Sequence, residues 1–237
     1  MKAYEVGLPG ARALFSTRDG GVSAPPYDTL NIGILTGDDR EAVVENRRRL
    51  AGRIGVAPER VAMGWQVHGA ELHEWSEGTE SRFADPDADL RKVDGHLTES
   101  AGLALLVLVA DCLPVALSGG GRVAMLHCGW RGLAGGIVER GVERFDEPPA
   151  AAVGPGIGPC CYEVGAEVLE AFADLDGVAD GRRLDLRAVV AQKLERAGVE
   201  HVEHVDLCTS CNPDLFFSHR RDGPETGRQA GTIVRAA

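Results

Sequence analysis

The alternation of apolar and polar positions along the chain predicts short strands interspersed with helices. Continuous apolar runs bounded by turn residues are typical of buried strands, and apolar residues spaced three or four apart are typical of helices. The longest apolar run, 103–110, has the length of a buried strand. The pattern predicts strands at 14–23 (running into a glycine turn), 61–67, 150–153, 202–205 and 227–234, a hairpin at 103–127, and helices at 133–145, 164–172 and 184–197.

One further helix has clear start and stop signals. Asp38 and Asp39 precede it, Val43 and Leu50 repeat on one face, and Gly55 follows. Acidic residues come first and arginines last, which complements the helix dipole. We therefore expect a capped helix that opens at the two aspartates and ends at the glycine.

The order of these elements predicts the fold class. Strands and helices do not alternate as parallel βαβ units would, and the central hairpin is antiparallel. Segment 77–92 is polar and is expected to be a long surface loop. No repeat, low-complexity tract or linker divides the chain. The sequence therefore predicts an α+β protein with a single domain over residues 1–237.

Composition and charge narrow the function classes. The chain is 44% hydrophobic and 26% charged, as soluble globular proteins are, and its net charge is −11. Such acidity disfavours nucleic acid and anionic membranes as partners, because both bind basic surfaces. No apolar run reaches the roughly 18–20 residues of a membrane helix, and the N-terminus lacks the apolar region of a signal peptide. We expect a cytoplasmic monomer whose six cysteines are reduced thiols.

The predicted hairpin brings a cysteine to a histidine. A two-residue turn at Gly119-Gly120 places Cys112 directly opposite His127. Directly opposed residues have Cβ atoms about 4.5–5.5 Å apart. A thiolate and an imidazole at that distance serve either as ligands of one metal ion or as a nucleophile and its base. The pairing indicates an enzyme rather than a binding module.

Other residues extend this candidate site. His68, beside a glycine at a strand end, would complete a His-Cys-His set with Cys112 and His127, and three protein ligands with an open fourth position are typical of catalytic zinc. Asp111 and Asp94 are candidates for bracing a histidine or for acid–base work. In an acidic protein, arginines beside glycine turns suggest recognition of phosphate or carboxylate.

The remaining cysteines and histidines carry weaker signals. Cys208 and Cys211 have CxxC spacing, but without a second CxxC motif they predict a structural or incidental role. The adjacent Cys160 and Cys161 suit neither a disulfide nor a chelate. His96 is expected to be structural. The other histidines are interpreted as surface or strand-end residues; they are His73, His201, His204 and His219.

Eight strings, taken in order, closely resemble the YfiH/YlmD family, which consists of bacterial laccase-domain proteins. They are FSTRDGGVS, LNIG, ENRRRL, QVHGAEL, ADCLPVAL, HCGWRGLAGG, GPGIGPCCYEVG and LCTSC…FFSHRRDGPETGRQAG. These strings span about positions 15 to 231, nearly the whole chain, and several are long and specific.

The resemblance implies a fold, a cofactor and an activity. The fold is a single-domain four-layer α/β/β/α sandwich with mixed sheets. The cofactor is Zn²⁺, with copper as the alternative, held by His68, Cys112 and His127. The activity is phosphorolysis of purine nucleosides (adenosine, inosine, guanosine and S-methyl-5′-thioadenosine) together with adenosine deamination. The partners are therefore purine nucleosides and phosphate.

These reactions assign roles to the candidate residues. Phosphorolysis needs a bound phosphate aimed at the ribose C1′, and arginines, Arg47 first, suit it. Deamination needs a metal-activated water and a carboxylate, for which Asp111 and Asp94 are the candidates. The catalytic set is Cys112, His127, Asp111 and Asp94. The set expected to bind substrate or phosphate is Arg47, Arg18, Gln66, Arg131 and Arg220.

Three other functions compete with this prediction. Cys112 as nucleophile with His127 as base would suit a metal-free amide hydrolase, for which a link of family relatives to peptidoglycan editing provides a substrate. A copper-dependent polyphenol oxidase would need many histidines, and the chain has seven with no His-x-His pair. A non-enzymatic metal sensor or partner-binding protein is the third alternative. The number of zinc ions bound per chain distinguishes the amide hydrolase from a zinc enzyme, because a metal-bound thiolate is a poor free nucleophile.

Overall fold

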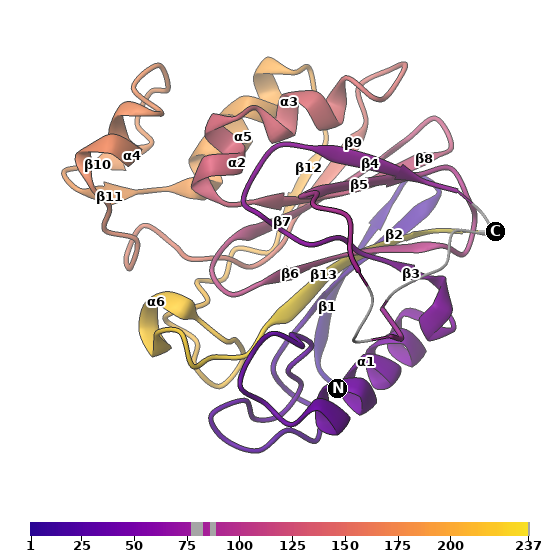
Figure 1. Ribbon diagram of the computed structural model, residues 1–237. Coiled ribbons are helices and arrows are strands. Elements are labelled where there is room, and N and C mark those ends of the chain that lie inside the picture. Colours follow the sequence, from indigo (N-terminus) through magenta and orange to yellow (C-terminus); the bar gives the residue numbers. More distant parts are fainter. Residues whose placement is uncertain (77–82, 86–88, 237) are drawn as a thin grey trace.

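The computed structural model describes residues 1–76, 83–85 and 89–236, and within them two mixed sheets pack face to face between helices (Figure 1). The strand order of the five-stranded sheet is β1 (Ala3–Leu8), β2 (Ala11–Ser16), β13 (Gln229–Arg235), β6 (Ala104–Val109) and β3 (Val61–Ala62). The strand order of the six-stranded sheet is β12 (Val202–His204), β9 (Ala150–Val153), β7 (Leu113–Gly119), β8 (Arg122–Cys128), β5 (Gly95–Thr98) and β4 (Leu72–Trp75).

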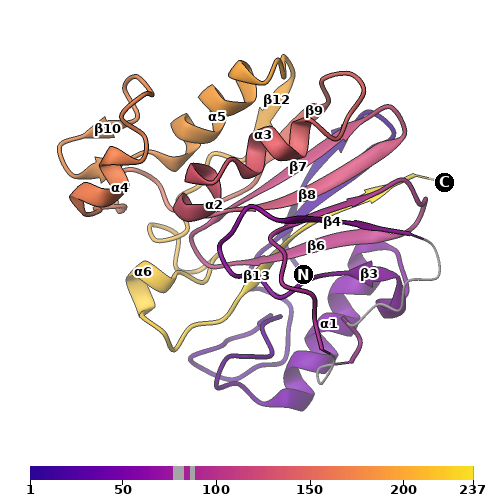
Figure 2. The ribbon, with the colours of Figure 1, turned by 45° about the horizontal axis from the view of Figure 1, so that its top comes forward.

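Helices cover the two outer faces. Helix α1 (Arg40–Ile54) lies on the five-stranded sheet, whereas α2 (Trp130–Ala134), α3 (Ile137–Val142) and α5 (Leu186–Arg196) lie on the six-stranded sheet (Figure 2). The smaller elements are η1 (Pro58–Arg60), α4 (Ala166–Glu170), β10 (Ala179–Asp180), β11 (Arg183–Leu184) and α6 (His219–Asp222). The expected four-layer α/β/β/α arrangement is confirmed.

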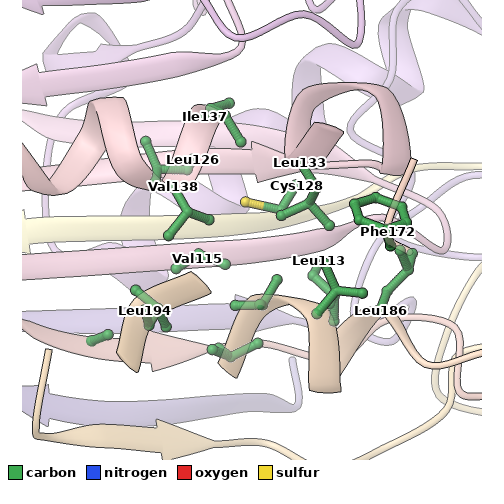
Figure 3. Packing of buried hydrophobic residues seen from close by; sticks show 14 of the residues in the cluster. Leu113, Val115, Leu126, Cys128, Leu133, Ile137, Val138, Phe172, Leu186 and Leu194 are labelled. Atoms are coloured by element: carbon green, nitrogen blue, oxygen red, sulfur yellow. The ribbon is translucent and has the colours of Figure 1, made fainter. Parts of the chain in front are cut away.

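Side-chain alternation along the strands builds three apolar layers. On β2, Phe15 points between the sheets and Leu14 points towards α1. On β8, Met125 faces the other sheet and Leu126 faces the outer helices, where it packs with Leu133, Ile137 and Val138 (Figure 3). Since alternate residues serve opposite cores, the central strands β6, β7 and β8 are buried on both faces and carry nearly continuous apolar runs.

The capped helix was predicted correctly. Asp39 accepts hydrogen bonds from the backbone N–H groups of Glu41, at 2.7 Å, and Ala42. Gly55 ends the helix in the left-handed conformation at φ +91°, which glycine adopts without steric cost. The expected helix at 133–145 is instead split into α2 and α3, because Gly136 at φ +83° interrupts it.

The expected hairpin at 103–127 was wrong in two respects. Segment 104–109 is β6 of the five-stranded sheet, and the chain crosses to the other sheet at Asp111 and Cys112 before the hairpin of β7 and β8 begins. The turn uses Gly120-Gly121, at φ +57° and +81°, so Pro114 rather than Cys112 is paired with His127. A run of three glycines left the register open, and sequence alone chose the wrong pair.

Other differences concern short or polar strands. Strands β1, β4 and β5 were not predicted, and the expected strand at 61–67 shortens to β3 plus an isolated bridge at Trp65. Of the expected loop at 77–92, residues 77–82 and 86–88 lie outside the described part. Within the described part, none of the helices has the length and apolar character that crossing a membrane requires.

Close approach of the two sheets depends on a glycine. A Cβ atom at Gly231, on β13, would overlap the Pro114 side chain on β7. Gly231→Ala should therefore lower the free energy of unfolding by about 1–3 kcal/mol through overpacking. Gly7→Ala, on β1, is the matched control because nothing lies within 4 Å of its Cβ position. Urea denaturation with equal m-values checks this; equal stability of the two variants would contradict it.

Candidate metal centre

Three distant segments bring His68, Cys112 and His127 together. His68 follows the bridge at Trp65, Cys112 lies where the chain crosses between sheets, and His127 points from β8 into the space between the sheets. Their ligand atoms all lie within 4.8 Å of one another, and the two imidazole rings meet edge to face at 4.8 Å. The predicted set is thus assembled, although the hairpin register that suggested it was wrong.

Asp94 anchors this group from behind. Its carboxylate is fully buried and accepts a hydrogen bond from His127 Nδ1 at 2.7 Å. It also accepts the backbone N–H groups of Val67 at 3.0 Å, His68 at 2.9 Å and Gly69 at 2.8 Å. Because Nδ1 is bound to this carboxylate, Nε2 of His127 is left for a metal ion, as in carboxylate–histidine–zinc groups.

The charged forms of Cys112, His127 and Asp94 stabilise one another. Burial by itself would raise the pKa of the Cys112 thiol, but His127 and His68 reverse this and lower it to about 6. Burial likewise opposes the charged form of His127, yet the Cys112 thiolate and Asp94 raise its pKa to about 9. Burial also opposes ionisation of Asp94, whose pKa is nevertheless lowered by His127 and backbone N–H groups. The cysteine is therefore held as a thiolate, the form that binds metals.

The backbone is strained on both sides of the centre. His68 and Asp111 have φ values of +59° and +94°, which non-glycine residues seldom adopt. Asp111 is fixed in this conformation because its carboxylate accepts Thr209 Oγ1 and the backbone N–H of Arg220, each at 2.6 Å. Such strain persists only where surrounding contacts enforce it, and it is concentrated at functional sites.

Gly129 leaves room for the two soft ligands. A Cβ atom there would lie 3.0 Å from Cys112 Sγ and 3.2 Å from the His68 ring. Sequence reasoning did not single out this residue, although it opens the GWRG string that follows His127 and Cys128.

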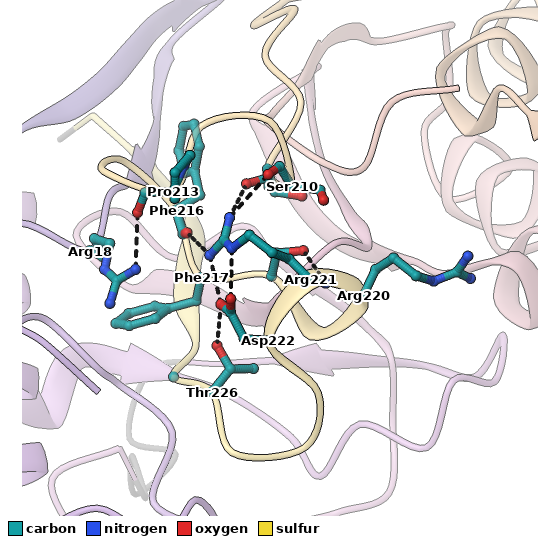
Figure 4. Close-up of polar contacts among 12 residues, drawn as sticks. Arg18, Ser210, Pro213, Phe216, Phe217, Arg220, Arg221, Asp222 and Thr226 are labelled. Atoms are coloured by element: carbon teal, nitrogen blue, oxygen red, sulfur yellow. Dashed lines mark hydrogen bonds and ion pairs between the residues drawn. The ribbon is translucent and has the colours of Figure 1, made fainter. Parts of the chain in front are cut away.

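A cavity of about 630 Å³ opens onto the three ligands. Of the residues expected to bind substrate, four line it; they are Arg47, Gln66, Arg131 and Arg220. Arg18 is absent from the lining, and its guanidinium binds Asp28 and the Pro213 carbonyl instead (Figure 4). Asp111 also lines the cavity, whereas Asp94 lies behind the ligands.

Two of the expected binding residues also hold the cavity wall. Arg47 is only 3% exposed and donates to the carbonyls of Ile32 at 3.0 Å and Phe83 at 2.9 Å. Burial lowers the pKa of its guanidinium to about 10, which leaves it charged at neutral pH. Gln66 pairs its amide with both the N–H and the carbonyl of Leu108, at 2.7 Å each. The arginine supplies a rigidly placed positive charge.

Several lining residues were missed by sequence reasoning. Arg228 is a second mostly buried arginine, and burial lowers its pKa. Leu35 and Trp65 are 73% and 44% exposed, unusual for large apolar residues. Tyr162 and His219 also line the cavity. Arg228 and His219 lie within a string that the chain shares with the family, and this shared string was the only sign in the sequence that they belong to the site.

His96 is structural, as predicted. It is fully buried and accepts Trp75 Nε1–H at 3.1 Å, and burial lowers its pKa to about 3.

The fold and the His-Cys-His group together define a laccase-domain protein with a candidate metal centre. The chain belongs to the family described as "Multi-copper polyphenol oxidoreductase laccase", which it matches over residues 12–236.

Relatives and solved structures agree with this assignment. The protein called purine nucleoside phosphorylase YfiH from Escherichia coli (strain K12) is 39% identical, covering 94% of this chain and 93% of the relative. Purine nucleoside phosphorylase YlmD from Geobacillus stearothermophilus is 38% identical, covering 95% and 90%. The crystal structure of YlmD from that organism superposes with a TM-score of 0.89 at 36% identity, covering 97% of this chain and 93% of that one.

The orienting role of Asp94 is testable. Asp94→Asn keeps the size but removes the charge that holds His127 Nδ1–H, so zinc affinity of the centre should fall about 10–100-fold. Competition with a chromophoric chelator measures this, with circular dichroism to confirm folding. Asp174→Asn, which removes an exposed carboxylate paired with Arg196, serves as the control. Unchanged affinity in Asp94→Asn would contradict the assignment.

Proposed function

We propose that this protein is a zinc-dependent purine nucleoside phosphorylase, acting on adenosine, inosine, guanosine and S-methyl-5′-thioadenosine, with adenosine deamination as a side activity. The observation that carries the proposal is a single cavity that holds a His-Cys-His group, buried arginines and exposed apolar side chains together. Relatives named purine nucleoside phosphorylase, matching nearly the whole chain, support the same reaction.

The centre suits zinc. Two imidazoles and a thiolate form a borderline-soft donor set, and the buried Asp94 orients one imidazole through Nδ1. His68, Cys112 and His127 would hold the ion with a position open towards the cavity. When bound, zinc supplies a Lewis acid that binds an oxygen of phosphate or of a sugar hydroxyl.

Arginines on the cavity wall would bind phosphate. Arg47 is buried and Arg228 is half-buried, so water screens their charges less than it would at the surface. Their carbonyl contacts fix each guanidinium before substrate arrives; Arg228 Nη1 donates to Thr226 and Gly227 at 2.8 Å each. A preset cation holds the attacking phosphate oxygens in place and stabilises charge in the transition state.

The exposed apolar residues would bind the purine base. Trp65 and Leu35 line the cavity although they are substantially exposed, and Tyr162 adds a second ring. Flat aromatic bases stack on such surfaces with little dependence on their substituents. This tolerance supports several purine nucleosides as substrates.

Of the two carboxylates, Asp111 is the better placed to act on substrate. It lines the cavity beside Cys112, whereas Asp94 is enclosed by its four donors and orients the ligands. We therefore assign proton transfer at the purine during deamination to Asp111, and Asp94 positions His127.

Cysteine chemistry without metal is a second candidate, favoured by one observation. Cys112 is held as a thiolate beside the protonated His127, which is the resting state of a nucleophile–base pair. This candidate predicts activity on an amide substrate in chelated, zinc-free protein. A multicopper oxidase has less support, because the searched residues of the described chain offer one histidine-containing ligand group and one made only of cysteines.

The test identifies the products formed from adenosine by metal-quantified protein, with and without phosphate. Adenine and ribose-1-phosphate that appear only with phosphate are the expected result. Inosine formed without a phosphate requirement would make deamination the principal activity. No turnover by zinc-loaded protein would contradict the proposal and favour the amide-cleaving alternative.

Arg47→Ala tests the phosphate site. The Michaelis constant for phosphate should rise at least tenfold more than that for nucleoside, because the lost charge faces phosphate. Arg48→Ala, which removes an exposed arginine of the same helix that pairs with Glu45, is the control and should change neither. Thermal melting checks folding, since Arg47 also binds two carbonyls. Equal increases for both substrates would count against the assignment.

A further inference from the structure

Two pairs of cysteines meet at one point: one pair was expected to have a structural or incidental role, and the other to suit neither a disulfide nor a chelate. Cys160 and Cys161 follow β9, and Cys208 and Cys211 follow β12. Strands β9 and β12 are parallel neighbours, so the chain segments after them leave the sheet at the same edge. Residues about fifty positions apart are therefore brought side by side, which the CxxC motif alone did not reveal.

We propose that Cys160, Cys161, Cys208 and Cys211 form a second metal site, an all-cysteine centre for Zn²⁺. Their sulfur atoms all lie within 4.8 Å of one another, with Cys211 Sγ 3.4 Å from Cys160 Sγ and 3.3 Å from Cys161 Sγ. Four thiolates bound tetrahedrally to zinc at about 2.3 Å stand about 3.8 Å apart. The observed spacing is close to that value and well beyond the roughly 2.05 Å of a disulfide.

Hydrogen bonds around the sulfurs resemble those of a metal site. The backbone N–H of Gly158 donates to Cys208 Sγ at 3.2 Å, which stabilises a thiolate. Asn212 Nδ2 donates to the Cys208 carbonyl at 2.8 Å and fixes the turn. A Cβ atom at Gly158 would lie 3.3 Å from both Cys160 Sγ and Cys208 Cβ, so a larger residue there would press on two of the ligands.

A nearby arginine braces the loop between Cys208 and Cys211. The Arg221 guanidinium donates to the carbonyls of Thr209, at 2.9 Å, and Ser210, at 3.3 Å, which are the two residues between Cys208 and Cys211 (Figure 4). The same guanidinium is ion-paired with the Asp222 carboxylate at 2.6 Å, so it fixes the shape of the ligand loop and adds no net positive charge to it.

This second centre is closed, unlike the first. Four cysteines fill a tetrahedral zinc shell, which is typical of structural sites. Thr209, inside the CxxC motif, donates to Asp111 in the strained turn before Cys112, and Tyr162, next to Cys161, lines the cavity. Zinc bound here would hold two segments that shape the catalytic cavity. The inference does not depend on which reaction that cavity performs.

The test uses Cys112→Ala protein, which removes the only cysteine of the first centre. Purified without air and loaded with Zn²⁺, it should retain about one zinc per chain. Loaded with Co²⁺, it should show sulfur-to-cobalt charge-transfer absorption of a tetrahedral thiolate site. Adding Cys211→Ser should abolish both the tight metal and most of this absorption. Adding Ser210→Ala instead, in the same loop, should leave them unchanged.

A wild-type measurement keeps the proposal testable if these variants unfold. Titration with an organomercurial, which blocks thiolates, should release two zinc ions per chain. Release of no zinc from wild-type protein, no metal in folded Cys112→Ala, or a disulfide among these cysteines in anaerobically purified protein would overturn the proposal. None of these results bears on phosphorolysis, which is measured separately.

Discussion

One buried carboxylate holds the candidate centre together. Asp94 sits at the start of β5 with no solvent exposure and accepts four hydrogen bonds, three from consecutive backbone N–H groups at 67–69 and one from His127. A buried anion is costly unless such donors surround it. Its requirement for partners thus fixes the positive-φ turn of His68 against β8, and that turn carries the histidine to Cys112. Without this carboxylate nothing equivalent would orient the two imidazoles.

The layering follows from patterns visible in the sequence. The alternation on β2, the apolar run of β6 and the capped helix α1 were all predictable, because burial and capping are local signals. For β7 and β8 the sequence predicted that a hairpin forms but not which residues face each other. That register depends on which two of the three glycines form the turn, and the packing of the two strands against their neighbours decides it.

The residues of the candidate site also fall into those that the sequence predicted and those that it did not. His68, Cys112 and His127 were identifiable from residue type and neighbouring glycines, and the structure brings them together. The four-cysteine group was not identifiable, because it is assembled by contacts between segments far apart in the chain, and Arg228 was marked only by its place in a string shared with the family. A sequence motif reveals ligands that lie close along the chain. It does not reveal that β9 and β12 end at the same edge of a sheet.

The two sulfur-containing groups differ in a way that suggests a reactive role for one and a structural role for the other. One combines histidines with a single thiolate, leaves a position open and faces a cavity with buried arginines. The other has four cysteine sulfurs, which as a proposed zinc site would leave no position open. A reactive centre needs the first arrangement and a structural clamp the second. Thr209 and Asp111 connect them through one 2.6 Å hydrogen bond.

We propose that the His68–Cys112–His127 centre, loaded with zinc, performs phosphorolysis. The most direct measurement is phosphate-dependent adenine release from adenosine while zinc is returned stepwise to chelated protein and bound zinc is quantified. Turnover should rise in proportion to the zinc bound at this centre, and Cys112→Ala should stay inactive at every zinc level. Full turnover by zinc-free protein, or by Cys112→Ala, would contradict it.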